Sequence, residues 1–159
     1  MQPKGNEDVV NVSIASDHAG FEQKQKLVAY LRSQGYEVFD RGPHTDDRVD
    51  YPDYAALVGS DVSQGACERG VLVCGTGIGM AIAANKIPGV RAANITTPEF
   101  AQLCREHNDA NVITLSGRFV GLEENQKILD TFFATEFGGG RHAARVAKIA
   151  TLENHSGTY

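Results

Sequence analysis

The sequence lacks the features of a disulfide-stabilised, membrane-spanning or nucleic-acid-binding protein. It has three cysteines, an odd number with no C-x-x-C pair and no clustering with histidines, which argues against a disulfide framework or a zinc site and favours a reducing compartment. No stretch approaches ~20 apolar residues, so no membrane span is expected. The net charge is −5 and the basic residues are scattered, which disfavours a nucleic-acid partner.

The chain ends carry no recognisable targeting signal. The N-terminus has no apolar signal core, and the C-terminus has no retention or peroxisomal tripeptide, so we expect a cytoplasmic protein. The length of 159 residues, with 42% hydrophobic and 22% charged residues, suits one globular domain. We predict a flexible leader over residues 1–10, the domain over residues 11–152 and a flexible tail over residues 153–159.

The most informative stretch is residues 70–93, where a short apolar run leads through glycines into a helical pattern. Residues 71–73 predict a buried strand, and the glycines at alternate positions after it are Gly75, Gly77 and Gly79. Such glycines let backbone N–H groups face a ligand oxygen, and a helix N-terminus adds partial positive charge. This joint therefore predicts an anion-binding site.

Cys74 stands at the mouth of that joint. Because the thiolate is the reactive form and a helix N-terminus favours it, Cys74 is a candidate nucleophile or base; the alternative is a small buried residue that ends a strand. A dinucleotide fingerprint requires G-x-G-x-x-G, whereas Met80 stands at the third glycine and no acidic residue closes residues 90–95. No cofactor is expected. Cys67 and Cys104 lie in helical neighbourhoods and are predicted to pack.

Strand and helix patterns alternate along the chain with short joints. Strands are predicted at residues 12–15, 36–39, 71–73, 90–93 and 112–115, and helices at 21–33, 54–64, 80–86, 98–105, 123–136 and 141–152. The pattern predicts an α/β fold: a single Rossmann-like domain whose five-stranded parallel sheet has the order 2-1-3-4-5, with helices on both faces and a C-terminal helix. Asp17, His18 and Cys74 would then open into one crevice.

Several other polar residues have both a functional and a structural interpretation. Asp17 could cap the first helix instead of binding a ligand. The loop over residues 40–53 is long enough to cover a site, and Tyr51 is its best candidate for ligand contact. Arg141 and Arg145 share one helix face, so they could clamp a phosphate or be solvated.

Six motifs together resemble the B-type ribose-5-phosphate isomerases, a family that includes galactose-6-phosphate and allose-6-phosphate isomerases. The motifs are Ser-Asp-His-Ala-Gly (16–20), Asp-Tyr-Pro-Asp-Tyr-Ala (50–55), Cys-Gly-Thr-Gly-Ile-Gly-Met (74–80), His-Asn-Asp-Ala-Asn-Val (107–112), Ser-Gly-Arg (116–118) and Gly-Gly-Gly-Arg-His (138–142). The resemblance implies metal-free interconversion of ribose 5-phosphate and ribulose 5-phosphate through a cis-enediolate, with a possible side activity on allose 6-phosphate. It also implies a homodimer with shared active sites, which could assemble further into a tetramer.

The resemblance also implies roles for individual residues. Cys74 would move the proton between C2 and C1, because Met80 stands where another branch of the family has a glutamate. Asp17 and His107 would help to open the furanose ring. The enediolate oxygens would be held by Thr76 and the loop amides of Gly75, Gly77, Ile78 and Gly79. The phosphate ligands would be His18, Arg118, Arg141 and Arg145, and the partner chain would supply His107, Asn108 and Arg118.

The sequence leaves several alternatives open. A hydrolase with Cys74 as its nucleophile is the main enzymatic alternative, and a non-catalytic sugar-phosphate sensor is the alternative from another class. Preference between five-carbon and six-carbon substrates is open, as is the choice between dimer and tetramer. The residues alone also allow His107 and Cys74 to meet within one subunit.

Overall fold

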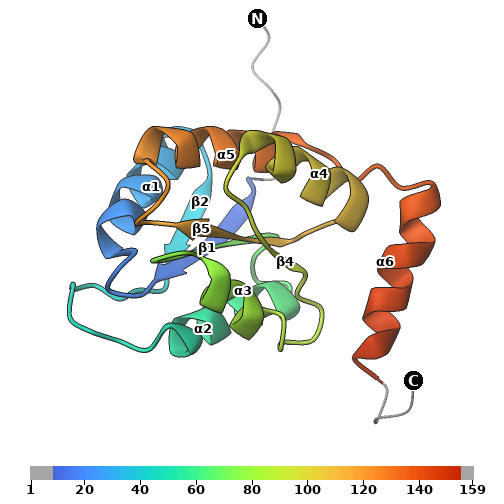
Figure 1. The fold of residues 1–159 in the computed structure, drawn as a ribbon, viewed down its shortest axis with the longest axis horizontal. Coiled ribbons are helices and arrows are strands. Elements are labelled where there is room, and N and C mark those ends of the chain that lie inside the picture. The colour runs from blue at the N-terminus through green and yellow to red at the C-terminus, as the bar shows by residue number, and fades with distance from the viewer. Residues whose placement is uncertain (1–8, 155–159) are drawn as a thin grey trace, which may run out of the picture.

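The computed structural model describes residues 9–154, which form one parallel sheet between two layers of helices (Figure 1). The strands are β1 (Asn11–Ser16), β2 (Glu37–Asp40), β3 (Arg69–Cys74), β4 (Ala92–Asn94) and β5 (Val112–Ser116). The helices are α1 (Phe21–Ser33), α2 (Tyr51–Ser63), α3 (Ile78–Ala84), α4 (Pro98–Asn108), α5 (Leu122–Ala134) and α6 (Arg141–Leu152). The predicted leader and tail fall largely on residues 1–8 and 155–159, outside the described residues.

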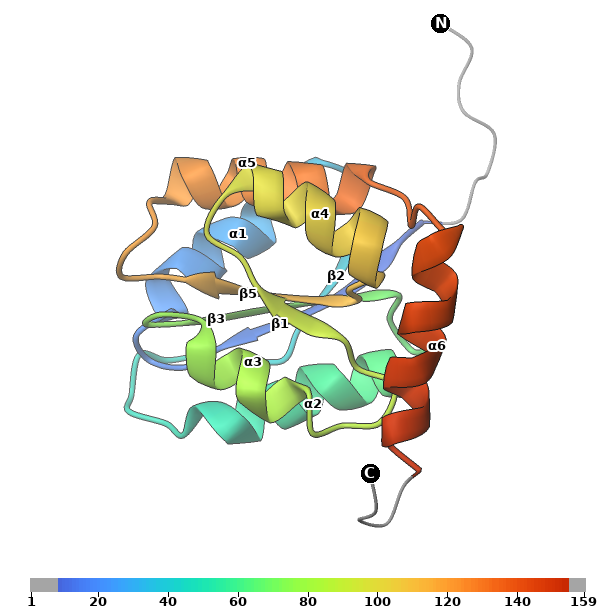
Figure 2. The same cartoon turned by 45° about the vertical axis from the view of Figure 1, so that its right-hand side comes forward.

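Two apolar clusters fill the space between the sheet and the helix layers. On one face α1, α4 and α5 cover the larger cluster, which includes Leu27, Ile113 and Phe132. On the other face α2 and α3 cover a smaller cluster, which includes Val58 and Met80 (Figure 2). Buried on both faces, β3 and β5 are rich in apolar residues, as central strands of parallel sheets are.

The strand order corrects one part of the predicted topology. The α/β class, the five parallel strands and the Rossmann-like arrangement are confirmed, but the order is β2-β1-β3-β5-β4, so the last two strands exchange places relative to the predicted 2-1-3-4-5. All five residues of β5 are buried, which suits an interior strand. None of the three residues of β4 is buried, which suits an edge.

Right-handed crossovers account for the helix layers in this order. The connections through α1 and α4 run in one direction along the sheet, and those through α2 and α3 run in the other. Because a right-handed crossover places its helix on a face set by that direction, α1 and α4 share one face and α2 and α3 share the opposite one.

Helix α2 begins three residues before its predicted start. It starts at Tyr51, so Pro52 lies in its first turn and not in the preceding loop. Proline is well accommodated there because its missing N–H has no partner in the first turn of a helix. Tyr51, predicted as a loop residue, is therefore fixed by a helix.

Helix α6 stands apart from the sheet and its two helix layers (Figures 1 and 2). It has no buried residue, and its contacts lie toward its ends, where His142 stacks on His107 and Glu153 Oε1 accepts the Gly89 N–H at 2.7 Å. Within residues 9–154 no helix is both long enough and apolar enough to cross a membrane.

A fully buried lysine joins α1 to the loop that follows β2. Lys24 is 0% exposed, and its Nζ donates to both Asp40 carboxylate oxygens at 3.0 Å and to the Pro43 carbonyl at 2.8 Å. A buried ammonium is tolerated only when such partners replace water. This ion pair therefore fixes the start of the loop that leads to Tyr51.

We expect Lys24→Met to destabilise the protein by about 3 kcal/mol, because it leaves the largely buried Asp40 carboxylate without its cation. Lys26→Met is the matched control: its pair with Glu22 is exposed, so the loss should stay below about 0.5 kcal/mol. Urea unfolding of both variants at one protein concentration measures the difference. Equal midpoints for the two variants would contradict a stabilising role for the buried pair.

Candidate active site

The carboxyl ends of β1, β3 and β5 bring three loops to one edge of the sheet. The parallel register pairs Ser16 with Val73 and Cys74 with Ser116, so the residues after these strands lie side by side. We call the candidate residues at this edge the carboxyl-edge cluster: Asp17, His18, Tyr51, the loop from Cys74 to Gly79, and Arg118. The predicted neighbourhood of Asp17, His18 and Cys74 follows from the adjacency of β1 and β3.

Cys74 ends β3 with its sulfur inside the glycine loop. The residue is 5% exposed, and the Gly77 N–H donates to its Sγ at 3.1 Å. Gly77 has φ +83°, and a Cβ there would lie 2.4 Å from Asn94 Oδ1, so glycine is required. A backbone N–H directed at sulfur is a better partner for a thiolate than for a thiol, since hydrogen bonds to ionised acceptors are stronger.

Other donors of the loop are also engaged within it. The Ile78 N–H donates to Thr76 Oγ1 at 3.2 Å. Two of the amides that were predicted to hold enediolate oxygens, those of Gly77 and Ile78, therefore bond to side chains of their own loop. Met80 is fully buried in the smaller core cluster, where it packs as an apolar side chain.

Asp17 and His18 are held by backbone groups. Asp17 is 7% exposed, and its Oδ1 accepts the Gly20 N–H at 3.0 Å; Gly20, not Asp17, is the N-cap of α1. The Val49 N–H donates to His18 Nδ1 at 3.3 Å. Because a backbone N–H can only donate, Nδ1 must be unprotonated in this bond, and a neutral His18 carries its proton on Nε2.

Tyr51 links the start of α2 to the glycine loop. Its ring lies 2.7 Å from where a Cβ on Gly79 would be, so only glycine allows this approach. A cavity of about 500 Å³ adjoins it, with a lining that combines carboxylates, a histidine and a guanidinium. The lining residues are Asp17, His18, Arg48, Val49, Asp50, Tyr51, Pro52 and Asp53.

Arg118 lies over the glycine loop of its own chain. Its backbone N–H donates to the Gly75 carbonyl at 3.1 Å, and its Nη1 lies 3.4 Å from where a Cβ on Gly75 would be. The structure thus places Arg118 of the same chain at this loop, whereas the resemblance implied Arg118 of the partner chain. The reason is that β5 neighbours β3, so the loop after β5 reaches Gly75 directly.

The remaining predicted residues form a second group, the amino-edge cluster: His107, Asn108, Arg141 and Arg145, joined by His142. The rings of His107 and His142 stack with centroids 4.3 Å apart. They line a cavity of about 570 Å³ with Glu106 and residues 134–138. Sequence reasoning missed His142, although it directly follows Arg141 in the Gly-Gly-Gly-Arg-His motif.

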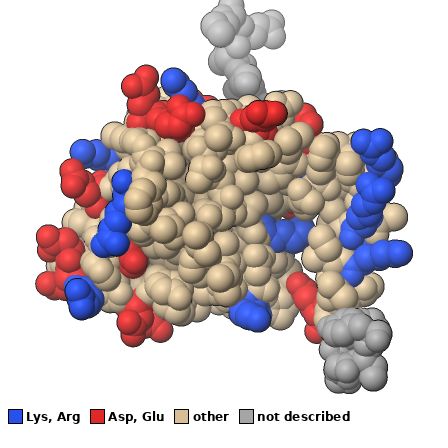
Figure 3. Space-filling model, viewed as in Figure 1, with Lys and Arg blue, Asp and Glu red and all other residues tan. Residues whose placement is uncertain are grey.

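The electrostatic surroundings of His142 favour its neutral form. Partial burial lowers its pKa below 6.5, and His107, Arg141 and Arg145 lower it further by charge repulsion. Figure 3 shows the basic side chains gathered along α6, where Arg141, Arg145 and Lys148 are exposed. The amino-edge cluster is thus a cationic surface suited to an anionic group.

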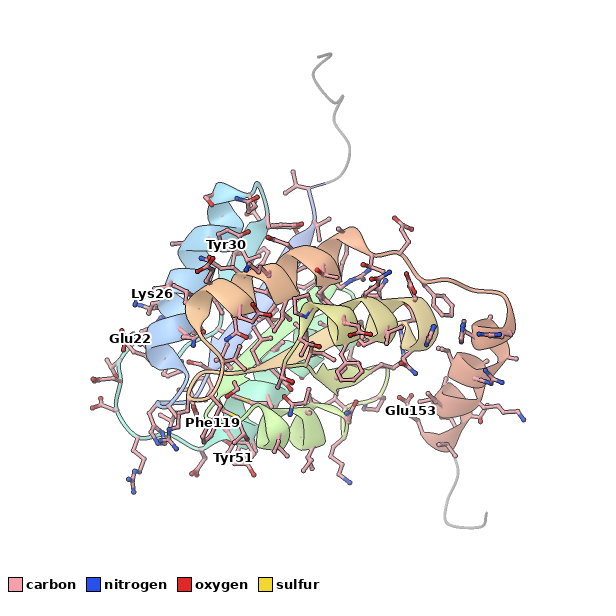
Figure 4. The ribbon with its side chains drawn as sticks, turned by 45° about the horizontal axis from the view of Figure 1, so that its top comes forward. Glu22, Lys26, Tyr30, Tyr51, Phe119 and Glu153 are labelled. Atoms are coloured by element: carbon pink, nitrogen blue, oxygen red, sulfur yellow. The ribbon has the colours of Figure 1, made fainter. Side chains whose placement is uncertain are left out.

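The two clusters lie at opposite edges of the sheet. The Gly70 N–H donates to the Asn111 carbonyl at 2.9 Å, which places the segment after α4 beside the start of β3. Cys74 is the last residue of β3 and therefore lies at the opposite end of this strand. Six strand residues span about 17 Å. In Figure 4, Tyr51 and Phe119 lie toward the lower left of the molecule and Glu153 lies on its right-hand side. His107 and Cys74 therefore do not meet within one chain, which the sequence had left open.

The geometry of the carboxyl-edge cluster indicates a class of protein. A cysteine in a glycine loop, at the carboxyl edge of a Rossmann-like sheet and beside an arginine, is suited to bind a small anionic molecule and exchange a proton with it. Within residues 9–154 no three His, Cys, Asp or Glu side chains gather as metal ligands would.

The chain belongs to the ribose/galactose isomerase family, whose model matches residues 12–149. It is 44% identical over 142 residues to ribose-5-phosphate isomerase B of Escherichia coli (strain K12), covering 89% of this chain and 95% of that protein. It is 46% identical over 143 residues to a probable ribose-5-phosphate isomerase B of Mycoplasma pneumoniae, covering 89% and 94% of the two chains.

Two structures agree with this membership. Ribose-5-phosphate isomerase B of Clostridium thermocellum superposes with a TM-score of 0.90 at 48% identity, covering 91% of this chain and 98% of that one. The enzyme from Mycoplasma genitalium with bound ribulose-5-phosphate gives a TM-score of 0.90 at 43% identity, covering 92% and 98%.

We expect iodoacetamide to label Cys74 first at pH 8. Burial raises the pKa of Cys67 and of Cys104 to about 11, so both stay protonated and unreactive until the pH approaches that value. Peptide mass spectrometry measures the three rates, and the denatured chain, in which all three thiols are exposed, is the control. Faster labelling of Cys67 or Cys104 at pH 8 would contradict the assignment of Cys74 as the reactive thiol.

Proposed function

We propose that this protein interconverts D-ribose 5-phosphate and D-ribulose 5-phosphate through a cis-enediolate, with Cys74 as the carbon base. The observation that carries the proposal is the Cys74 sulfur held in the glycine loop by the Gly77 N–H. Family membership and the ribulose-5-phosphate bound to the Mycoplasma genitalium enzyme support the choice of substrate.

The reaction needs one base, oxyanion donors and a grip on a remote phosphate. The Cys74 thiolate takes the proton from C2 of the opened aldose and returns it to C1. Thr76 and the remaining amides of its loop stabilise the enediolate oxygens, each donor contributing about 3 kcal/mol in comparable oxyanion holes. Tyr51 closes the substrate cavity beside Gly79.

Ring opening and phosphate binding are assigned to residues of both clusters. Asp17 and His107 exchange protons with the ring oxygen and the C1 hydroxyl. His18 donates from Nε2 to the phosphate, in keeping with the tautomer that the Val49 N–H favours. Arg118, Arg141 and Arg145 supply the charge-assisted bonds.

The separation of the clusters supports a homodimer with two shared sites. Because one chain holds His107, Asn108, Arg141 and Arg145 about a strand length from Cys74, a complete site requires these residues from a second copy. Large apolar side chains near the carboxyl edge suit such a contact: Ile78, Ile82, Phe100 and Phe119 are each more than half exposed. A two-fold pairing completes two equivalent sites, and a tetramer of such dimers stays open.

Cys74→Ala should lower kcat at least 100-fold, because removal of a general base costs that much or more. Folding and substrate binding should persist, since the change leaves only a small cavity. Cys104→Ala, which also alters a buried cysteine, is the matched control and should stay active. A coupled assay with ribose 5-phosphate, allose 6-phosphate and galactose 6-phosphate side by side measures turnover and chain-length preference.

The same preparations distinguish the alternative functions. A C74A variant that keeps more than about a tenth of wild-type kcat would rule out the base assignment. A hydrolase would form a covalent adduct on Cys74. A sensor would bind ribose 5-phosphate without exchanging its C2 proton with deuterated solvent.

We expect that mixing inactive Cys74→Ala and His107→Ala chains restores activity. After joint unfolding and refolding, random pairing makes half of the dimers mixed, and one of the two sites in each mixed dimer carries no lesion. Activity should return to about a quarter of wild type in the coupled assay. If each site drew both residues from one chain, the mixture would stay as inactive as its parents.

A further inference from the structure

The loop that carries Arg118 is fastened from the side of β3. The Gly117 N–H donates to the Cys74 carbonyl at 2.8 Å, and Ser116 Oγ donates to the Gly75 carbonyl at 2.7 Å. The Arg118 N–H donates to the same Gly75 carbonyl, so residues 116–118 are fixed to the end of β3 and the residue after it. None of these bonds uses the Gly117 or the Val120 carbonyl.

The side chain of Gln23 holds those carbonyls from α1. Its Nε2 donates to the Gly117 carbonyl at 3.1 Å and to the Val120 carbonyl at 2.7 Å. The two acceptors flank Arg118, so one amide group bridges the turn on which the guanidinium is carried. A side-chain amide has two N–H donors, and both are used here.

Asn125 of α5 sets the orientation of that amide. Its Nδ2 donates to Gln23 Oε1 at 2.8 Å and to the Ser116 carbonyl at 3.0 Å, and the residue is 0% exposed. Because Gln23 Oε1 accepts from Asn125, its Nε2 must face the loop. The pair thus has one hydrogen-bonding arrangement, and reversing the Gln23 amide would set oxygen against two carbonyls.

We propose that Gln23, oriented by Asn125, is a positioning residue that holds Arg118 in place for the phosphate group of a sugar phosphate. This rests on the proposed function for the identity of the ligand. Gln23 lies in α1, six positions after Asp17, and its amide bonds to the loop after β5, so it joins α1 to the loop that carries Arg118. It acts through the backbone of residues 117–120 and needs no contact with substrate.

The test is Gln23→Glu, which keeps the size of the side chain and the acceptor for Asn125 but removes both donors. We expect KM for ribose 5-phosphate and the competitive inhibition constant of inorganic phosphate each to rise about tenfold, with kcat changed less than threefold, because a phosphate bond made equally in ground and transition states is weakened. Gln34→Glu, an exposed change at the end of the same helix, should alter none of the three.

A double-variant cycle identifies the route of the effect. In an Arg118→Ala background, Q23E should not raise the phosphate constant further, since its effect passes through Arg118. Independent, multiplicative effects of Q23E and R118A would overturn the proposal. So would a Q23E protein with a lower melting temperature but an unchanged phosphate constant, which is the result of a purely structural role.

Two further measurements test the role of Gln23 if Q23E does not fold or if the wild-type protein is inactive. If Q23E does not fold, Gln23→Met, which has similar length and no charge, replaces it with the same expectations. If the wild-type protein does not turn over ribose 5-phosphate, the proposed function fails, and calorimetric binding of inorganic phosphate to wild type, Q23M and R118A still tests Gln23. Equal phosphate affinities of wild type and Q23M would then refute its positioning role.

Discussion

The parallel pairing of β1, β3 and β5 is the constraint on which the site depends. Parallel strands with right-handed crossovers all end at one edge, so the loops after these three strands meet there whatever their sequences are. The register then fixes which residues are neighbours: Ser16 beside Val73, and Cys74 beside Ser116. Two side chains of α1 bond to segments that flank these strands: Lys24 donates to Asp40, and Gln23 donates to the Gly117 carbonyl.

Much of the fold could be predicted because local pattern and tertiary role agree. The apolar run before Cys74, the glycines after it and the helical periods around it have one physical interpretation each, and the α/β class followed. The exchange of β4 and β5 was not predicted, because strand order depends on which run is buried on both faces. The sequence does carry a difference that fits the observed order: residues 90–95 include Arg91 and Asn94, whereas residues 112–115 are Val-Ile-Thr-Leu. Pro52 was read as a loop residue, since a proline equally suits a loop and a first helical turn.

The residues of the candidate site likewise include some that the sequence could predict and some that it could not. Residues adjacent to strand ends, such as Asp17 and Cys74, were predictable because topology alone brings them together. For Arg118, the predicted order put β4 between β3 and β5 and so gave no reason to expect it beside Gly75 of its own chain. His142 was not noticed, because its place depends on a contact with His107, which is distant in the sequence. The amide pair of Gln23 and Asn125, 102 residues apart, left no signal at all. From sequence alone, a polar residue within a helix is expected to face solvent, because the loop to which its side chain bonds is not known.

The length of β3 also bears on why such a site would be shared. A strand of six residues sets Cys74 and the amino-edge cations at opposite edges, and no side chain spans about 17 Å. A single chain could unite them only by folding α6 back over the carboxyl edge, but α6 is fastened at both ends, by His142 on His107 and by Glu153 on Gly89. The proposed two-fold partner would avoid that conflict, since it would present its amino-edge cluster as a preformed surface. In the proposed dimer each chain would keep its own scaffold, and assembly would bring Arg141 and Arg145 of one chain to Cys74 of the other.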